Sequence, residues 1–202
     1  MTDHAPSMKA YGSARRSLIA MLGGECTGKT ALAQQLAHEL KLAYVPEALR
    51  AFVDRHQRVP NQAEQLTILQ QQCEWIQDAL CDVGPDREGP LLICDVSPWM
   101  TAIYSLQYFG DAELLVQAQA LMLQLASVHQ CRWLHFHCAD DIEWSADGMH
   151  RDGPSHRARS RELIEAYLPF GESIEQGWCE WIAGDMKARV EKVLQYLTRG
   201  SA

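Results

Sequence analysis

The sequence predicts an α/β domain built on a five-stranded parallel sheet with helices on both faces. Three observations support this fold class. Short apolar runs alternate with longer segments of helical periodicity, a pattern typical of parallel sheets whose crossovers are helices. The first apolar run ends in a glycine-rich turn that leads into a helical segment. Carboxylates and polar loops follow the later runs, at the edge of the sheet where such folds bind ligands.

The glycine-rich turn spans residues 23–30 and fits G-x-x-x-x-G-K-[ST], the P-loop of nucleotide-binding proteins. Gly23 and Gly28 permit close backbone approach, so that the N–H groups of the loop can cradle phosphate oxygens at the start of a helix. Lys29 brings positive charge to the β- and γ-phosphates, and Thr30 offers a hydroxyl to Mg²⁺. The predicted nucleotide-binding residues are Gly23, Gly24, Glu25, Cys26, Thr27, Gly28, Lys29 and Thr30.

The flanking segments supply the context that this motif requires. The apolar run 17–22 predicts a buried parallel strand. Residues 30–40 predict a helix, because Leu32, Leu36 and Leu40 recur on one face. A strand, a glycine loop and a helix in this order argue against the alternative, a glycine turn that binds nothing. The sequence therefore predicts a P-loop NTPase with ATP and Mg²⁺ as cofactors.

The later elements continue the alternation of strands and helices. Apolar residues recur at helical spacing in the longest of them, and glycines and prolines mark the loop at 83–90. The elements expected after the first helix are a strand at 42–46, a helical turn at 47–53, a helix at 62–82, a strand at 91–95, helices at 97–108 and 112–128, a strand at 132–138, a basic helix at 154–168, a strand at 178–183 and a final helix that ends at 197.

Composition narrows the class of protein. The chain has 202 residues, which suits one domain, and a loose tail is expected at 1–16. Its net charge of −8 argues against broad nucleic-acid binding, which needs a basic face. No apolar run reaches the ~18 residues of a membrane span, and no secretory signal is evident. Seven cysteines without a Cys-x-x-Cys pair suit reduced thiols, so we expect a cytoplasmic protein with neither membrane nor nucleic-acid partners and of open oligomeric state.

Two carboxylates at strand ends are candidates for chemistry beside the P-loop. Asp95 ends the run 91–95 and can hold the magnesium shell or a substrate hydroxyl; the alternative is a helix N-cap. Glu47 follows the second strand and can accept the proton of an attacking hydroxyl. Arg50 can hold a substrate oxygen or orient Glu47. The alternative for Glu47 and Arg50 is a surface ion pair at i,i+3.

A basic cluster follows the fourth strand of this acidic chain. It contains Arg151, Arg157, Arg159 and Arg161. Arginines stabilise the charge that phosphoryl transfer spreads over the γ-oxygens, and Arg151 and Arg157 are the strongest candidates for that role. The alternative is a solvated helix face balanced by nearby glutamates.

Aromatic and histidine side chains allow two interpretations. Trp99, Tyr104 and Tyr44 can stack on a flat substrate base, with Trp99 assigned to substrate binding, or they can pack in the core. His135 and His137 alternate on one strand. Two histidines make no zinc site without further ligands, so a structural role is expected for them.

These motifs together resemble the ribosylnicotinamide-kinase domain of the bacterial NAD-biosynthesis regulator and its stand-alone relatives, often described only as AAA-family ATPases. The similarity covers about residues 18–197, and it is carried by the segments 22–30, 47–50, 92–95 and 144–151.

The resemblance implies a nucleoside-kinase-like domain at 17–202 that binds ATP through the glycine loop. It also implies that Glu47 and Asp95 face the nucleoside and magnesium, and that Arg151 belongs to a lid. Two departures from the family pattern are visible. His150 shifts Arg151 one place beyond the usual spacing, and Ser97 stands where a second acidic residue is common.

The resulting hypothesis is a P-loop kinase that transfers the γ-phosphoryl group of ATP to the 5′-hydroxyl of ribosylnicotinamide or a similar nucleoside. Its catalytic residues would be Lys29, Glu47, Asp95, Arg151 and Arg157, with ATP and a small acceptor as partners. A kinase of another small metabolite is one alternative. An ATP-dependent binding switch with little turnover is the other.

Overall fold

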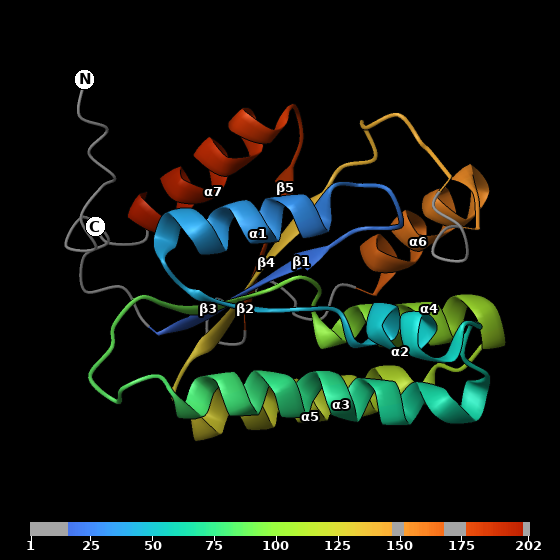
Figure 1. The fold of residues 1–202 in the computed structure, drawn as a ribbon, viewed down its shortest axis with the longest axis horizontal. Helices are drawn as coiled ribbons and strands as arrows, with labels where there is room; N and C mark the ends of the chain where they lie inside the picture. Colours follow the sequence, from blue (N-terminus) through green and yellow to red (C-terminus); the bar gives the residue numbers. More distant parts are fainter. Residues whose placement is uncertain (1–15, 147–151, 168–176, 200–202) are drawn as a thin grey trace.

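The computed structural model of the chain describes residues 16–146, 152–167 and 177–199. Within them a single parallel sheet has the strand order β2-β3-β1-β4-β5, drawn in Figure 1. The strands are β1 (Ser17–Leu22), β2 (Ala43–Val45), β3 (Pro90–Cys94), β4 (Arg132–Cys138) and β5 (Gly177–Ile182). The predicted fold class, a five-stranded parallel sheet of the P-loop type, is confirmed.

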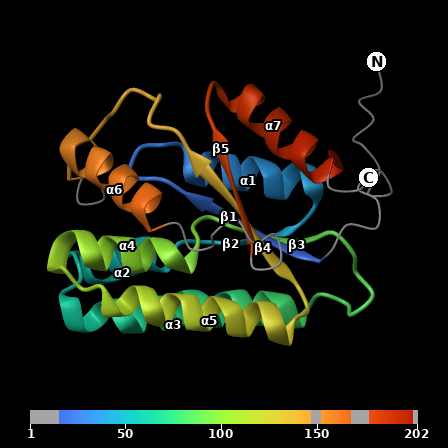
Figure 2. The ribbon, with the colours of Figure 1, turned by 180° about the vertical axis from the view of Figure 1, so that it is seen from behind.

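Helices cover both faces of this sheet. Figures 1 and 2 show α1 and α7 together on one face, and α3, α4 and α5 on the other. Among the described helices, none has the length and apolar character of a bilayer span. The helices are α1 (Lys29–Leu40), α2 (Ala48–His56), α3 (Gln62–Cys81), α4 (Pro98–Phe109), α5 (Glu113–Val128), α6 (Pro154–Ala166) and α7 (Met186–Arg199).

The central strand β1 is buried on both faces, and its side chains alternate between two cores. Leu18, Ala20 and Leu22 belong to the core that contains the apolar faces of α3, α4 and α5. Ile19 and Met21 belong to the core beneath α1 and α7. This two-sided burial explains why β1 reads as a continuous apolar run.

The helix α2 is longer than predicted from the sequence. A helical turn was expected to end near Val53, but α2 continues to His56. Gln57 then adopts a left-handed conformation (φ 54°), and its N–H donates to the Val53 carbonyl. Arg55 and His56 lie in the last turn, where positive charge complements the helix dipole, so their polarity was misread as a sign of a loop.

The loop between α2 and α3 is held by the start of α3. The Asn61 side chain accepts a hydrogen bond from the Glu64 N–H at 3.2 Å, and the Glu64 carboxylate accepts one from the Asn61 N–H at 2.9 Å. The same carboxylate pairs with Arg58 at 2.6 Å. This capping box fixes the first turn of α3, which lines the candidate site described below.

Arg16 anchors the beginning of β1. Its guanidinium donates hydrogen bonds to the carbonyls of His129, Gly84, Pro85 and Arg87. These bonds connect the start of β1 with the loops that precede β3 and β4. Arg16 was counted within the tail expected at 1–16, and the rest of that tail lies outside the described residues.

Two buried histidines sit side by side on β4. The exposed fractions of His135 and His137 are 0% and 3%, and His135 Nε2 lies 3.0 Å from the Ser97 hydroxyl. Burial lowers the pKa of His135 to about 3 and that of His137 to about 4. In the described part of the chain, no group of three or more metal-ligating side chains is present. The structure therefore places both histidines, uncharged near neutral pH, in the core.

Acidification should destabilise this fold at pH values above those at which most carboxylates titrate. The folded pKa values of His135 and His137 lie below the ordinary value near 6.5. Below about pH 6.5 the unfolded chain therefore binds protons that the folded chain excludes. Each histidine should remove about 1.4 kcal/mol of unfolding free energy between about pH 7.5 and about pH 5.5. Urea unfolding of the wild type, His135→Gln and His137→Gln at both values measures this. Identical pH dependence in all three proteins would contradict the assignment.

Candidate functional site

The P-loop begins where β1 ends and passes directly into α1. A side chain fits at neither of its first two glycines. A Cβ atom on Gly23 would lie 2.9 Å from the Cys138 carbonyl, and one on Gly24 would lie 2.9 Å from the Arg157 carbonyl. The end of β4 and the start of α6 therefore pack directly against the loop backbone, which only glycine allows without a backbone shift.

The backbone N–H groups of the P-loop are without a hydrogen-bond acceptor in the part of the chain that the structure describes. Within the described residues, the N–H groups of residues 24–28 donate no hydrogen bond. The Gly24 carbonyl accepts hydrogen bonds from the Thr27 hydroxyl at 2.9 Å and from the Lys29 ammonium at 2.6 Å. The loop thus presents unpaired donors and a lysine at a helix N-terminus, the arrangement that binds phosphate.

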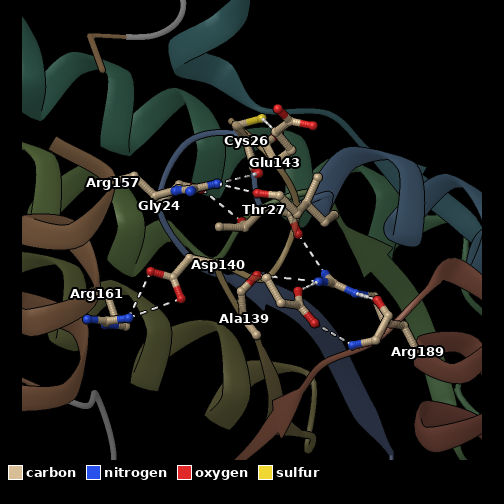
Figure 3. A network of polar contacts seen from close by, with 12 residues as sticks. Gly24, Cys26, Thr27, Ala139, Asp140, Glu143, Arg157, Arg161 and Arg189 are labelled. Atoms are coloured by element: carbon tan, nitrogen blue, oxygen red, sulfur yellow. Dashed lines mark hydrogen bonds and ion pairs between the residues drawn. The ribbon is translucent and has the colours of Figure 1, made fainter. Parts of the chain in front are cut away.

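The buried guanidinium of Arg189 in α7 holds the other side of the loop, as Figure 3 shows. Arg189 is 0% exposed. It donates to the Thr27 carbonyl at 2.6 Å, to the Gly184 carbonyl at 2.7 Å and to the Ala139 carbonyl at 3.4 Å. It also pairs with the Asp141 carboxylate. One side chain therefore ties the P-loop to the loops that follow β4 and β5.

The predicted basic cluster lies partly in α6, against the same loops (Figure 3). Arg157 donates to the Ile142 carbonyl at 2.7 Å and to the Cys26 carbonyl at 3.4 Å. Arg161 pairs with Asp140 at 2.8 Å. Arg157 thus holds the loop after β4 against the P-loop, and Arg161 holds that loop against α6. Neither arginine is among the residues that line the cavity.

A cavity of about 860 Å³ lies between the P-loop, α2, the start of α3, α4 and α6. The P-loop side contributes Lys29 and Thr30. The α2 side contributes Glu47 and Arg50. This volume is at the upper end of the range for small-molecule sites, so the cavity can hold more than a phosphate group.

A buried glutamine of α3 fixes the backbone on both sides of Glu47. Gln72 is 0% exposed. Its Nε2 donates to the Pro46 carbonyl at 3.1 Å, and its Oε1 accepts from the Ala48 N–H at 2.8 Å. Glu47 occupies the N-cap position of α2, but its side chain makes no capping hydrogen bond. The carboxylate is thus directed to the cavity wall from a fixed backbone.

Asp95 lies directly after β3, beneath the cavity rather than on its surface. Asp95 is 1% exposed, and its Oδ2 accepts a hydrogen bond from the Tyr44 hydroxyl at 2.8 Å. Burial, and then the Asp95 charge, raise the pKa of Tyr44 above its usual range. Oδ1 of Asp95 is buried and has no hydrogen-bond partner among the described residues. A buried carboxylate oxygen without a hydrogen-bond partner is better suited to contact a cation or its water shell than to cap a helix.

Two hydrogen bonds and one ring contact hold the start of α6 beside the cavity. The Gly153 N–H donates to Glu25 at 3.2 Å, and the Tyr108 hydroxyl donates to Asp152. The Tyr108 ring also stacks on His156, with ring centroids 5.8 Å apart. Burial is the main cause that raises the pKa of Glu25, and the nearby Asp152 charge adds to it. Glu25 thus joins the P-loop to the helix that carries the basic cluster.

The structure brings together most, but not all, of the residues predicted from the sequence. Asp95 and Trp99 are not among the cavity-lining residues. Trp99 is 5% exposed, and its indole N–H donates to the Tyr167 carbonyl at 2.8 Å, which places it in the core. Arg151 lies outside the described residues. Those that line the cavity are Glu25, Cys26, Thr27, Gly28, Lys29, Thr30, Glu47 and Arg50.

Sequence reasoning missed several cavity residues. Tyr108 was not noticed, although it follows Tyr104 by four positions on α4 and so shares its helix face. Gln65 fell within the predicted helix 62–82 without a role of its own, and His156 was given none beside the arginines of the basic cluster. The periodicity of α4 was the one available signal, since the other two residues face the cavity only because of tertiary packing.

The chain is similar to one protein family and to several solved structures. A family model described as an AAA domain matches residues 18–174. No curated protein matches the sequence. Among solved structures, the chain is similar to the NadR protein in complex with NAD and AMP-PNP, with a TM-score of 0.64 and 14% identity over 95% of this chain and 51% of that chain. The chain therefore spans about half the length of that protein, and the likeness confirms the fold.

Two further solved structures are similar at lower scores. The APS kinase CysC of Mycobacterium tuberculosis, in complex with AMPPNP and APS, has a TM-score of 0.48 and 12% identity over 91% of this chain and 98% of that chain. The shikimate kinase of Acinetobacter baumannii, in complex with shikimate, has a TM-score of 0.45 and 12% identity over 95% of this chain and 97% of that chain.

Arg189→Met should destabilise the protein by about 3 kcal/mol. The substitution leaves the Thr27 and Gly184 carbonyls without their charged donor in a buried setting, and removing one partner of a buried pair is costly. Urea unfolding measures the loss. The matched control is Arg159→Met, which removes an exposed pair with Glu162 and should change stability by no more than about 0.5 kcal/mol. Equal effects of the two substitutions would remove Arg189 from its structural role.

Proposed function

The chain belongs to the AAA domain family, and we propose that it is an ATP-dependent kinase of a small, nucleoside-like acceptor. One observation carries this proposal: the P-loop lysine and a carboxylate on a fixed backbone line the same cavity. Lys29 and Thr30 supply the phosphate side, and Glu47 supplies a group able to accept a proton. A kinase requires these two chemistries to face one space.

The nucleotide is assigned to the P-loop side of the cavity. The unpaired N–H groups of residues 24–28 and the N-terminus of α1 favour phosphate oxygens there. Lys29 is buried against the Gly24 carbonyl, and we expect it to exchange that carbonyl for the β- and γ-phosphates. The result is charge stabilisation at the oxygens on which negative charge develops.

Thr30 and Asp95 would hold Mg²⁺ beside those phosphates. Thr30 lines the cavity, and Asp95 has a buried, unpartnered carboxylate oxygen. When bound, the ion would neutralise charge on the β- and γ-oxygens. Since Asp95 lies beneath the cavity surface, we assign it to the water shell of the ion and to the orientation of Tyr44.

Glu47 is the proposed base for the acceptor hydroxyl. Gln72 holds the peptide groups on both sides of it, so its position does not depend on a mobile loop. Arg50 lies one helical turn further along α2 and lines the same cavity, where it can hold an acceptor oxygen. Arg157, engaged with two carbonyls, is assigned to holding the P-loop and could reach a phosphate only by leaving them.

The acceptor is proposed to be ribosylnicotinamide, phosphorylated on its 5′-hydroxyl. The support is the resemblance carried by the segments 22–30, 47–50, 92–95 and 144–151. The cavity also has the aromatic and apolar surface that a flat base requires, because Tyr104, Tyr108 and Phe109 line it. A role in NAD biosynthesis and a cytoplasmic location belong to the same proposal.

A panel of acceptors tests this function. With ATP and Mg²⁺, ribosylnicotinamide should stimulate ADP release and yield its 5′-monophosphate in equal amount. Lys29→Ala, the control, should bind ATP weakly and show almost no turnover, because within the described residues no other cationic side chain donates to the Gly24 carbonyl. If another nucleoside or metabolite stimulates ADP release instead, the enzyme is a kinase of that compound. If none does while ATP still binds, the nucleotide-dependent switch replaces the kinase.

Glu47→Gln should lower kcat and leave ATP affinity nearly unchanged. The amide keeps the shape of the side chain but cannot accept a proton, and loss of a general base typically costs ~10²–10⁴-fold in rate. Steady-state kinetics and calorimetric titration with ATP separate the two quantities. Glu39→Gln on the exposed side of α1, where the Glu39 carboxylate accepts a hydrogen bond from Gln35, is the matched control. A Glu47→Gln variant with full kcat would reduce Glu47 to a structural contact of α2.

A further inference from the structure

The side-chain carbonyl oxygen of Gln65 is a buried polar atom on a residue of the cavity wall. Gln65 lies in the first turns of α3 and is 3% exposed. It lines the cavity, yet its Oε1 is buried and has no hydrogen-bond partner among the described residues. A buried amide oxygen without a donor is unfavourable, so its presence on a ligand-sized cavity points to a ligand.

A second glutamine on the same helix shows how this chain treats a structural amide. Gln72 lies seven residues further along α3 and is also fully buried. Both ends of its amide are paired, one with the Pro46 carbonyl and the other with the Ala48 N–H. Gln72 therefore has a structural explanation that Gln65 lacks.

Gln65 lies on a fixed turn of α3 and is buried. The capping box of Asn61 and Glu64 fixes the turn of α3 that carries it, and the Arg58 pair reinforces that box. Val53, Val59 and Pro60 line the cavity with it and offer no hydrogen-bond donor. Among the described residues, no hydrogen-bond donor reaches the Oε1 atom of Gln65.

We propose that Gln65 recognises a primary carboxamide on the flat ring of the acceptor. This inference rests on the proposed function and names the feature by which that site selects its substrate. A carboxamide carries one donor and one acceptor side by side, so it can form a reciprocal pair with the Gln65 amide in either orientation. A carboxylate has no N–H to donate and would bring negative charge against the Gln65 oxygen.

Arg50 is the competing feature in the same cavity. Its positive charge would favour an acceptor that carries a carboxylate. Arg50 already makes a contact within the chain, so an acceptor carboxylate would have to compete for it. If the wild type prefers the acceptor with a carboxamide, Gln65 controls the selection. If it prefers the matching carboxylic acid, Arg50 does.

The experiment compares ribosylnicotinamide with its carboxylic acid analogue, nicotinic acid riboside. Binding is measured by calorimetric titration without ATP, and kcat/KM is measured with ATP and Mg²⁺. The wild type should favour the amide by about tenfold or more. Gln65→Met, of similar length but without an amide, should bring that ratio near one, mainly through a higher KM for the amide.

Gln72→Met is the matched control on the same helix. It should lower kcat for both acceptors equally, since it loosens the backbone around Glu47, and it should leave their ratio unchanged. The melting temperatures provide an independent readout. Gln65→Met should melt no lower than the wild type, because it removes an unpaired buried oxygen, whereas Gln72→Met should melt lower because it leaves two backbone groups unpaired.

The outcomes separate this inference from the function on which it rests. A ratio unchanged by Gln65→Met, a wild type that prefers the acid, or a wild type that binds neither riboside overturns the role of Gln65. If the binding ratio responds to Gln65→Met while neither riboside is phosphorylated, the role of Gln65 stands and the kinase proposal fails.

Discussion

A P-loop can bind phosphate only if its N–H groups turn to one side, and its carbonyl groups must then find donors elsewhere. In this chain the donors come partly from the loop itself and partly from distant helices. The Gly24 carbonyl accepts from Thr27 and Lys29 of the loop, whereas the Cys26 and Thr27 carbonyls accept from Arg157 of α6 and Arg189 of α7. The shape of the loop therefore depends on tertiary contacts as well as on its own residues.

This constraint accounts for the arrangement of the loops around the site. Arg189 also holds the backbone after β4 and β5, and Arg157 holds Ile142. The same two side chains that satisfy the P-loop thus set the edge of the sheet beside it. An arginine that would be read as a phosphate contact from its charge and position, such as Arg157, is in this structure a support for the loop that binds the phosphate.

The fold could be predicted from the sequence, and so could the part of the candidate site that contains the P-loop and Glu47. The P-loop is a local pattern, and Glu47 directly follows a strand, so both could be located from short segments. Gln65 and Gln72 show why the other half could not. They are the same residue type, seven positions apart on one face of α3, and only the pairing of Gln72 with Pro46 and Ala48 distinguishes the paired amide from the unpaired one. Arg189 was missed for a similar reason, since a lone arginine in an amphipathic helix is normally solvated.

The acceptor side of the cavity gathers negative charge, which is unfavourable for the stability of the fold. Tyr104 is half-buried near several carboxylates, and its pKa is raised first by burial and then by the charge of Glu47. Asp95 contributes to the same effect from beneath the cavity, and one of its oxygens is unpaired. Negative charge gathered in a partly dry space is unfavourable unless a cation or a proton-donating ligand enters it. The wall opposite the P-loop is thus organised for what binds in the cavity rather than for the stability of the fold.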